Sequence, residues 1–254
     1  MTRAPTSAAR PADGPFQGRV SFADVAERIE SIDLGDEPVT MRERFARLIR
    51  GGQAGQEPPV GTSETVGGVD TLVVPPPDGA SGAARVVWFH GGGYVFGAPE
   101  THWRPAAALA AAVAAPVVLP RYRLAPEHPW PAPLDDALAV ARALQDVGHP
   151  VAFAGDSAGG HLALVAALTL AREGRPVTAL ALFSPNTDRT GLSDTRAAHS
   201  DRDPMNDAAQ DRALAALAFG ARPYDHPQAS PVLDDLALLP STHVEVGDRE
   251  VLLG

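Results

Sequence analysis

The sequence predicts an α/β fold in which a mostly parallel sheet is covered by helices on both faces. From about residue 66 onward, short apolar runs typical of strands alternate with longer segments of helical periodicity. This alternation indicates a parallel sheet, because parallel strands need a long crossover connection and are buried on both faces. With 254 residues, 44% of them hydrophobic, the chain is long enough to bury one large core.

The first 60 residues are predicted to form an N-terminal arm and cap helices. Residues 1 to about 18 are rich in Pro, Gly, Ala and Ser, a composition that favours a loose arm. Two amphipathic helices are expected between residues 19 and 50. In the second helix Met41 and Phe45 lie one turn apart on an apolar face.

Residues 61–254 are predicted to form the core domain. Strands are expected at residues 69–74, 85–89, 117–119, 151–153, 179–183 and 243–246. Helices are expected at residues 101–115, 134–147, 157–172 and about 206–219. Gly148 and Gly174 follow two of these helices, where a left-handed residue commonly ends a helix. Open sheets of this kind bind ligands at the carboxyl ends of their strands, so the site is expected there.

The composition excludes several classes of site and partner. The chain has no cysteine and no lysine, so all 21 residues of the Lys and Arg class are arginine. Disulfides, zinc–thiolate sites, lysine-dependent phosphate loops and Schiff-base lysines are therefore ruled out. The net charge of −10 and the lack of a basic cluster argue against nucleic-acid binding. No apolar run approaches the length of a membrane span and no signal-peptide pattern opens the chain, so a soluble, cytoplasmic protein is expected.

The most informative motif is Gly-Asp-Ser-Ala-Gly-Gly at residues 155–160. It follows the apolar run 151–154 and precedes an apolar helical segment, residues 161–170, that contains no helix breaker. A serine flanked by glycines between a strand and a helix is typical of a nucleophile elbow, in which a sharp turn exposes the hydroxyl. Trypsin-like proteases have a similar sequence around their serine, but they are all-β proteins, and the long helix after Ser157 argues against that class. Ser157 is therefore the predicted nucleophile.

A second glycine-rich motif, His-Gly-Gly-Gly-Tyr, occupies residues 90–94 directly after the predicted strand 85–89. Glycines at this place let the backbone bend closely around a ligand and direct amides toward it. In an acyl-transfer enzyme such amides stabilise the negative oxygen of the tetrahedral intermediate. Because this motif lies one strand–helix–strand unit before the serine motif, both are expected to meet at one site.

With these motifs the chain resembles the hormone-sensitive-lipase-like (family IV) esterases and lipases of the α/β-hydrolase fold. The resemblance covers about residues 35–254. Further family landmarks occur in order, namely Tyr-Arg-Leu-Ala-Pro-Glu-His-Pro-Trp-Pro-Ala at residues 122–132, Ser184-Pro185, Asp203-Pro204, Ser230-Pro231, and Val-Gly-Asp-Arg-Glu-Val-Leu-Leu at residues 246–253.

The resemblance implies an apolar pocket that binds short-chain or aryl esters, covered by helices from residues 19–50 and by a cap insertion at about residues 190–225. It implies no cofactor. The spacing expected of His or carboxylate metal ligands is absent, so no metal is predicted, and Asp234-Asp235 is expected to be a solvated turn.

The resemblance also implies a role for each motif residue. Ser157 corresponds to the nucleophile. The backbone amides of Gly92, Gly93 and Ala158 correspond to the oxyanion hole. Gly91 is a further candidate donor, because the position of a glycine in the motif does not settle which two of the three donate.

The acidic member of the catalytic triad follows the last predicted strand in this family. Alignment on Val-Leu-Leu places Glu250 at that position, with Asp248 as the alternative. The family pattern makes Asp156, Tyr122 and Glu127 supporting residues that brace the loops around the site.

The chain departs from the family at the catalytic base. The triad order in this fold is serine, acid, histidine, and no histidine follows Glu250 before Gly254. Of the eight histidines, His90 belongs to the glycine motif, His161 lies on the helix after the serine, and the others have no obvious route to Ser157. Loss of a triad histidine costs on the order of 10⁶ in turnover. We therefore expect a C-terminally truncated member that lacks the last strand and helix and has little or no activity.

Two other classes remain open. A catalytically silent small-molecule-binding protein of the same fold would keep the pocket without the base; the missing histidine favours this class, and the intact serine and glycine motifs disfavour it. A serine peptidase of the same fold is disfavoured because no propeller domain precedes the sheet. The predicted partner is a small-molecule ester, with no membrane or nucleic acid, and a homodimer is compatible with the sequence.

Overall fold

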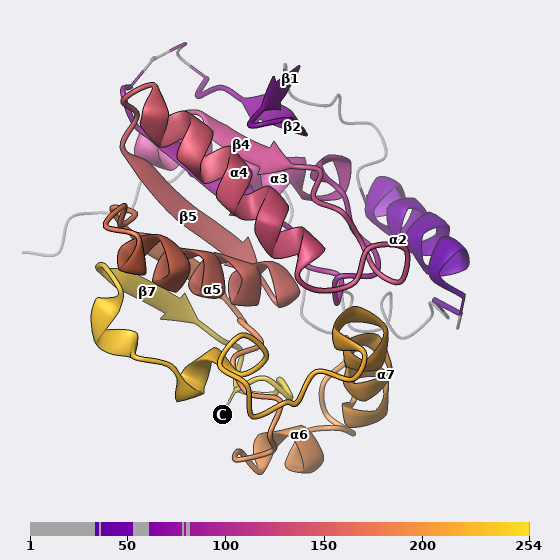
Figure 1. The fold of residues 1–254 in the computed structure, drawn as a ribbon. Coiled ribbons are helices and arrows are strands. Elements are labelled where there is room, and N and C mark those ends of the chain that lie inside the picture. Colours follow the sequence, from indigo (N-terminus) through magenta and orange to yellow (C-terminus); the bar gives the residue numbers. More distant parts are fainter. Residues whose placement is uncertain (1–33, 36, 53–60, 78, 80–81, 254) are drawn as a thin grey trace, which may run out of the picture.

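The computed structural model describes residues 34–253 apart from residues 36, 53–60, 78, 80 and 81. The predicted arm and the first predicted cap helix lie outside this part of the chain. The described residues form one seven-stranded sheet with the order β1-β2-β4-β3-β5-β6-β7 (Figure 1). The strands are β1 (Thr62–Val66), β2 (Val69–Val74), β3 (Arg85–Phe89), β4 (Val117–Pro120), β5 (Val151–Asp156), β6 (Leu180–Phe183) and β7 (Thr242–Glu245). The helices are α2 (Pro38–Gly52), α3 (Pro99–Val113), α4 (Ala132–Asp146), α5 (Ala158–Arg172), α6 (Thr195–Ala198) and α7 (Ala208–Phe219), with short 3₁₀ turns η1 (Pro231–Leu233) and η2 (Leu236–Leu238).

The predicted mostly parallel α/β fold is confirmed. The neighbours β4-β3-β5-β6-β7 pair in parallel, whereas β1 and β2 add an antiparallel edge beside β4. Every strand and core helix predicted from the sequence is present, with boundaries shifted by a few residues. Gly148 and Gly174 have positive φ angles after α4 and α5, as predicted for helix ends.

The sequence analysis missed β1 and the short helix α6. β1 has no apolar face, since four of its five residues are exposed, so it lacks the alternation that marks a strand. Its register pairs Val66 with Val69, which leaves Gly67 and Gly68 as a two-residue hairpin turn. Both glycines have positive φ, the conformation that such a turn requires.

Alternate residues of β3 face opposite sides of the sheet. Val87 and Phe89 belong to a core cluster that includes the apolar sides of α4 and α5, whereas Val86 and Trp88 belong to a second cluster with α3. Figure 1 shows α4 and α5 on one face of the sheet and α3 on the other. Helices therefore cover both faces, as the buried apolar strands predicted. Among the described helices, none has the length and apolarity needed to cross a membrane.

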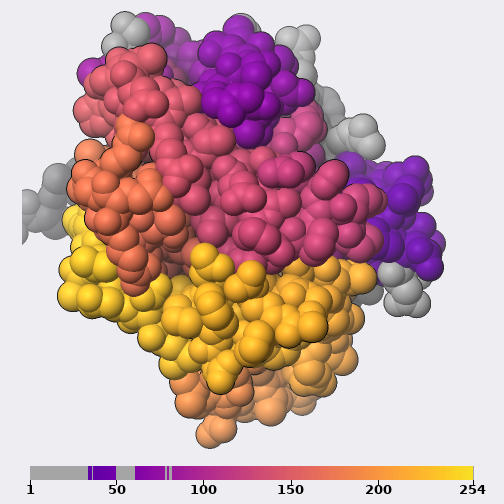
Figure 2. Space-filling view, in the orientation of Figure 1, coloured from indigo at the N-terminus to yellow at the C-terminus, as the bar shows by residue number. Residues whose placement is uncertain are grey.

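The two motif loops meet at one edge of the sheet. Because β3 and β5 pair in parallel, their carboxyl ends lie next to each other, and each leads directly into a glycine-rich loop. Helices α2 and α7 lie beyond this edge (Figure 1). Figure 2 shows the orange and yellow segments that follow β6 packed directly against the pink and red helical layer. The site is thus enclosed between the sheet edge and these helices.

Candidate active site

Ser157 occupies the turn between β5 and α5. Its backbone has φ 51° and ψ −117°, a conformation that residues with a side chain rarely adopt and that stores strain. Glycines make the turn possible. A Cβ on Gly159 would lie 2.0 Å from the carbonyl oxygen of Phe89, and a Cβ on Gly155 would lie 2.5 Å from that of Gly159. The predicted strand–turn–helix geometry at the serine motif is therefore present.

Three backbone amides at the same cavity as Ser157 donate no hydrogen bond to any described residue, namely those of Gly92, Gly93 and Ala158. The amide of Ala158 is free because it belongs to the first residue of α5, where no preceding carbonyl of the helix is in reach. The amide of Gly91, the further candidate donor, differs: it donates to Asp156 Oδ2 at 3.0 Å. Three amides thus remain available to a ligand oxygen, and Gly91 is not among them.

Asp156 joins the glycine loop to the serine turn. Its Oδ2 accepts the Gly91 amide and lies 3.3 Å from His102 Nε2, while its Oδ1 accepts the indole N–H of Trp88 at 3.1 Å. Burial alone would raise the pKa of Asp156, but the charge of His102 and the hydrogen bonds from His102 and Trp88 bring it below the usual 3.8. Asp156 is therefore a carboxylate that braces both loops, the supporting role expected of it.

His102 is a residue of the site that sequence reasoning missed. It was placed on a helix without a route to the serine, yet it lies on α3 facing the cavity that Ser157 lines. Burial lowers the pKa of His102, but the nearby Asp156 carboxylate outweighs burial and raises it above 6.5. Its Nδ1 lies 2.8 Å from Thr101 Oγ1, so both ring nitrogens already have partners. His102 therefore supports Asp156 and does not accept the Ser157 proton.

None of the eight histidines, all of which are described, hydrogen-bonds to Ser157 Oγ. His90 Nδ1 contacts the Gly91 carbonyl at 2.8 Å, His161 Nδ1 contacts Tyr94 Oη at 2.5 Å, and His199 Nδ1 contacts the Glu250 carbonyl at 2.9 Å. The described structure therefore holds a nucleophile turn and free amides without a histidine base in contact.

A cavity of about 590 Å³ opens at Ser157. Its apolar wall comes from helices on both sides of the site, with Phe45 and Leu48 of α2 and Leu214 of α7. Both candidate acids, Glu250 and Asp248, line the same cavity.

The two candidate acids differ in their surroundings. Glu250 is partly buried and its Oε1 accepts the amide of Gly247 at 3.0 Å, whereas Asp248 is exposed. A triad acid works by holding a histidine in one orientation, which requires a carboxylate that is itself held. This contrast supports Glu250 over Asp248.

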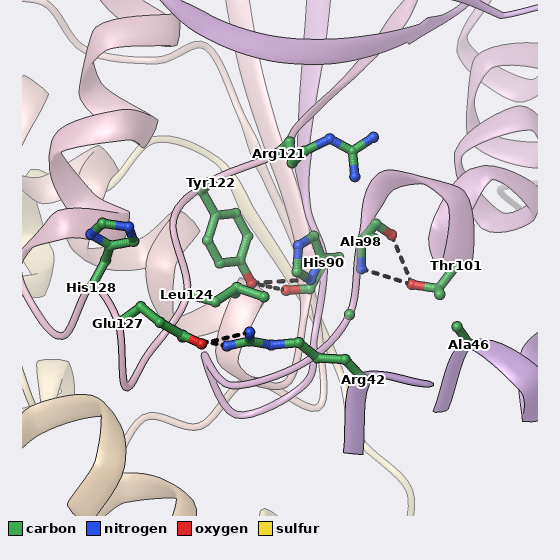
Figure 3. Close-up of a pocket in the computed structure, with 11 residues that line it drawn as sticks. Arg42, Ala46, His90, Ala98, Thr101, Arg121, Tyr122, Leu124, Glu127 and His128 are labelled. Atoms are coloured by element: carbon green, nitrogen blue, oxygen red, sulfur yellow. Dashed lines mark hydrogen bonds and ion pairs between the residues drawn. The ribbon is translucent and has the colours of Figure 1, made fainter. Parts of the chain in front are cut away.

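A second cavity, of about 520 Å³, lies behind the glycine loop, and its polar side chains brace that loop. Figure 3 shows Arg42 extending from α2 to Glu127, with both carboxylate oxygens in contact at 2.9 and 2.7 Å. Arg42 also donates to the carbonyls of Val95 and Ala125, and Tyr122 Oη donates to the His90 carbonyl at 2.6 Å.

The Arg42 guanidinium lowers the pKa of Glu127 to about 2. Half of the Glu127 side chain is exposed, so the ion pair contributes little stability by itself. Glu127 and Tyr122 therefore have the loop-bracing contacts expected of them.

A buried charged cluster attaches α7 to the loop after β6. Asp211 of α7 accepts Asn186 Nδ2 at 2.8 Å and Arg196 Nη1 at 2.5 Å, and lies 3.5 Å from Arg189 Nη1. Only 4% of the Arg189 side chain is exposed, and its guanidinium lies over the Phe219 ring at 4.9 Å. Buried charges of this kind are tolerated only when paired, so the cluster fastens α7 to α6 and to the loop after β6.

The expectation of a solvated turn at Asp234-Asp235 holds for Asp235, which is exposed, and is corrected for Asp234. Both oxygens of Asp234 pair with Arg172 at the end of α5, and 16% of the Asp234 side chain is exposed. Asp235 accepts the amide of Ala237 and begins η2. The adjacent carboxylates thus have separate structural roles. Across the described residues, no group of three or more His, Asp or Glu side chains is arranged to hold a metal.

His161 is enclosed by aromatic side chains. Its ring lies between 5.5 and 5.7 Å from those of Tyr94, Trp130 and Phe219. Burial lowers the pKa of His161 to about 3 and does the same for His90. Both histidines are therefore neutral in the folded protein at pH values where they would be protonated in the unfolded chain.

This difference predicts a proton-linked loss of stability in acid. Below pH 6.5 the unfolded chain binds a proton at each of these histidines and the folded protein does not until about pH 3, so the free energy of unfolding falls as the pH drops through this window. Urea unfolding measured between pH 6.5 and 4.5 should show His161→Gln taking up one proton fewer on unfolding than the wild type. His243→Gln is the control, because the His243 side chain is 69% exposed and lies outside the aromatic cluster. Equal pH dependence in wild type and His161→Gln would contradict the prediction.

Comparison with known proteins agrees with this geometry. A family profile described as alpha/beta hydrolase fold matches residues 86–254. An acetyl-hydrolase of Streptomyces hygroscopicus is 37% identical over 171 residues, and the esterase LipI of Mycobacterium tuberculosis is 38% identical over 184 residues. These matches cover 66% and 68% of this chain but 57% and 53% of the two relatives. The chain thus spans little more than half the length of these curated relatives.

Solved structures show the same relationship over more of the chain. An esterase from the bacterial hormone-sensitive lipase family superposes with a TM-score of 0.85 at 31% identity, covering 91% of this chain and 79% of that one. The family profile matches more than half of the chain. The chain belongs to the hormone-sensitive-lipase-like family of α/β-hydrolase-fold esterases.

Proposed function

We propose that this chain carries the acyl-transfer site of a carboxylic ester hydrolase. One observation carries the proposal: Ser157, in a strained turn, lines the same cavity as the three amides that have no acceptor among the described residues. Such amides stabilise the charge that develops on an ester carbonyl oxygen under attack. The names of the relatives, acetyl-hydrolase and esterase, support the same class of reaction.

In the proposed reaction Ser157 Oγ attacks the ester carbonyl carbon and releases its proton to water, since no histidine base is in contact, and the carbonyl oxygen becomes an oxyanion held by the amides of Gly92, Gly93 and Ala158. Collapse of this intermediate breaks the bond to the alkoxy oxygen, which takes up a proton from water and leaves as the alcohol, while the acyl group stays on Ser157. Water then hydrolyses the acyl-enzyme, which releases the carboxylic acid and restores the serine. Because α5 begins at Ala158, its N-terminal dipole adds to the positive potential at the oxyanion. Glu250 is the proposed acid that would orient a histidine base.

The lack of a histidine base at Ser157 limits the proposed activity of the 254-residue chain. Since no described histidine contacts Ser157, we expect slow turnover. The binding and oxyanion contributions that remain amount to roughly 10³ to 10⁴ over the reaction in water. The same observation favours the second candidate, a catalytically silent small-molecule-binding protein that uses the cavity without turnover.

The proposed substrates are short-chain or aryl esters. The cavity of about 590 Å³ has room for a small acyl group and its alcohol, and its apolar wall suits alkyl or aromatic groups. We propose that residues 190–225, which include α6 and α7, act as the cap over this cavity. A cytoplasmic location and a homodimer stay predictions.

Covalent labelling tests the proposal independently of turnover. Prolonged incubation with diethyl p-nitrophenyl phosphate should release one equivalent of p-nitrophenol and leave one diethylphosphoryl group, which mass spectrometry of peptides should locate on Ser157. Ser157→Ala should take up no label. A label elsewhere would contradict the assignment of the nucleophile. Binding of p-nitrophenyl butyrate without any label would favour the silent binding protein.

A further inference from the structure

The loop that carries Glu250 is held by the cap segment. The carbonyl of Glu250 accepts a hydrogen bond from His199 Nδ1 at 2.9 Å. The next residue, Val251, forms hydrogen bonds to the cap through both of its backbone groups. Its amide donates to Asp203 Oδ2 at 3.0 Å, and its carbonyl accepts from Thr195 Oγ1 at 3.2 Å. All three partners lie between β6 and α7, in the proposed cap.

The loop after β7 also contains local hydrogen bonds. β7 ends at Glu245, Gly247 donates to Glu250 Oε1 at 3.0 Å and accepts from the Glu250 amide at 3.3 Å, and the Leu253 amide donates to the Glu250 carbonyl at 3.3 Å. Val251 is buried, whereas residues 247–249 before it are exposed. The cap thus supplies hydrogen bonds to both Glu250 and Val251.

Asp203 is the charged member of this contact. Its Oδ1 accepts the amides of Met205 and Asn206 at 2.8 and 3.2 Å, which shapes the turn before α7. Its Oδ2 reaches across to the Val251 amide. Hydrogen bonds to an ionised acceptor are about twice as strong as neutral ones, so one side chain links the turn of the cap to the acid loop.

A second aspartate of the cap provides a comparison. Asp207 lines the same cavity and also accepts two backbone amides, those of Ala209 and Gln210, with its Oδ1 at the start of α7. No hydrogen bond links Asp207 to the acid loop within the described residues. Both aspartates thus accept backbone amides of their own turn, and of the two only Asp203 also accepts the amide of Val251.

We propose that Asp203 is a positioning residue that couples the cap to the loop carrying Glu250. With the cap over the cavity, Asp203 holds Val251 and Glu250 faces the cavity; when the cap moves away, the acid loop loses this support. Acid placement and cavity closure are then one event, so a bound ester and a correctly placed acid stabilise each other. The inference rests on the proposed function only in taking Glu250 as the triad acid.

Amide hydrogen exchange of Val251, measured by NMR on the full 254-residue chain, tests the coupling without any need for turnover. In Asp203→Ala the Val251 amide should exchange about tenfold to a hundredfold faster than in the wild type, because a hydrogen bond to a charged group is lost. Asp203→Asn has one acceptor oxygen where the carboxylate uses two, so it cannot accept the amides of Met205 and Asn206 and that of Val251 at once, and Val251 should again exchange faster than in the wild type. Asp207→Ala should speed exchange at Ala209 and Gln210 and leave Val251 unchanged. The Leu168 amide of α5 serves as the reference for global opening.

The effect of a bound ligand on Val251 exchange distinguishes coupling from a merely structural role of Asp203. Phenylboronic acid, which bonds reversibly to a serine hydroxyl, should slow Val251 exchange in the wild type and should fail to do so in Asp203→Ala. Unchanged Val251 exchange in Asp203→Ala overturns the proposal, as does equal acceleration of Val251 in Asp203→Ala and Asp207→Ala. Failure of the proposed esterase function would appear in the labelling experiment, as absence of the label on Ser157. The Val251 exchange rates of the ligand-free variants would still test the coupling.

Discussion

Free imidazole is expected to raise the rate at which this chain hydrolyses p-nitrophenyl acetate, by on the order of a hundredfold at saturation, and Ser157→Ala is expected to abolish that gain. The physical reason is that Ser157 and its three free amides are in place while the base is not. A small diffusible base that enters the cavity of about 590 Å³ can take the serine proton, and general-base assistance contributes about 10² to 10⁴.

The comparison without imidazole is equally informative. Members of a catalytic triad act as a unit, so removing the nucleophile costs little once the base is missing. Wild type and Ser157→Ala should therefore hydrolyse p-nitrophenyl acetate and butyrate at similar slow rates in buffer. They should diverge only as imidazole is added, after the direct reaction of imidazole with the ester is subtracted. Brisk turnover of the wild type in buffer alone, lost in Ser157→Ala, would show that a base is present and that the expectation of an impaired chain is wrong.

The second large effect concerns stability. Gly159→Ala should lower the free energy of unfolding by more than about 3 kcal/mol or prevent folding. The added Cβ would lie 2.0 Å from the Phe89 carbonyl oxygen and 2.5 Å from that of His90. These are backbone atoms at the end of β3, held by parallel pairing with β5, so they cannot move aside without breaking the sheet.

Gly174→Ala is the matched control at the opposite end of the same helix. A Cβ there would meet no atom within 4 Å, and only its φ of +74° is unfavourable. The cost should be about 1 to 2 kcal/mol, the usual penalty for a left-handed residue with a side chain. Urea unfolding of both variants measures the difference. Equal losses at the two positions would contradict contact with β3 as the reason that position 159 requires glycine.

Much of the fold could be predicted because its signals are local. The strand before residue 155, the glycines around Ser157 and the uninterrupted helix after it lie within about twenty consecutive residues. β1 was not predicted because it has no such local signal. Its exposed residues show no apolar periodicity, and it forms a strand because the turn at Gly67-Gly68 pairs it with β2.

The candidate site was predictable in part. Motif position predicted Gly92, Gly93 and Ala158 at one site with Ser157, and all four line one cavity. It left Gly91 undecided, and the structure shows that the Gly91 amide donates to Asp156. His102 could not be assigned to the site from the sequence, because it lies on a predicted helix outside both glycine-rich motifs. Its role comes from its contact with the carboxylate of Asp156 at the end of β5.

The sequence by itself determined the order of strands and helices along the chain and the serine at the turn between β5 and α5, because these are properties of neighbouring residues. Only the tertiary structure decided which amides remain free and which side chains hold the site together. His102 and Asp156 are 54 residues apart, Gly91 and Asp156 are 65 apart, and Asp203 and Val251 are 48 apart. Sheet pairing and cap packing bring these groups within hydrogen-bond distance, and separation along the chain does not encode distance in space.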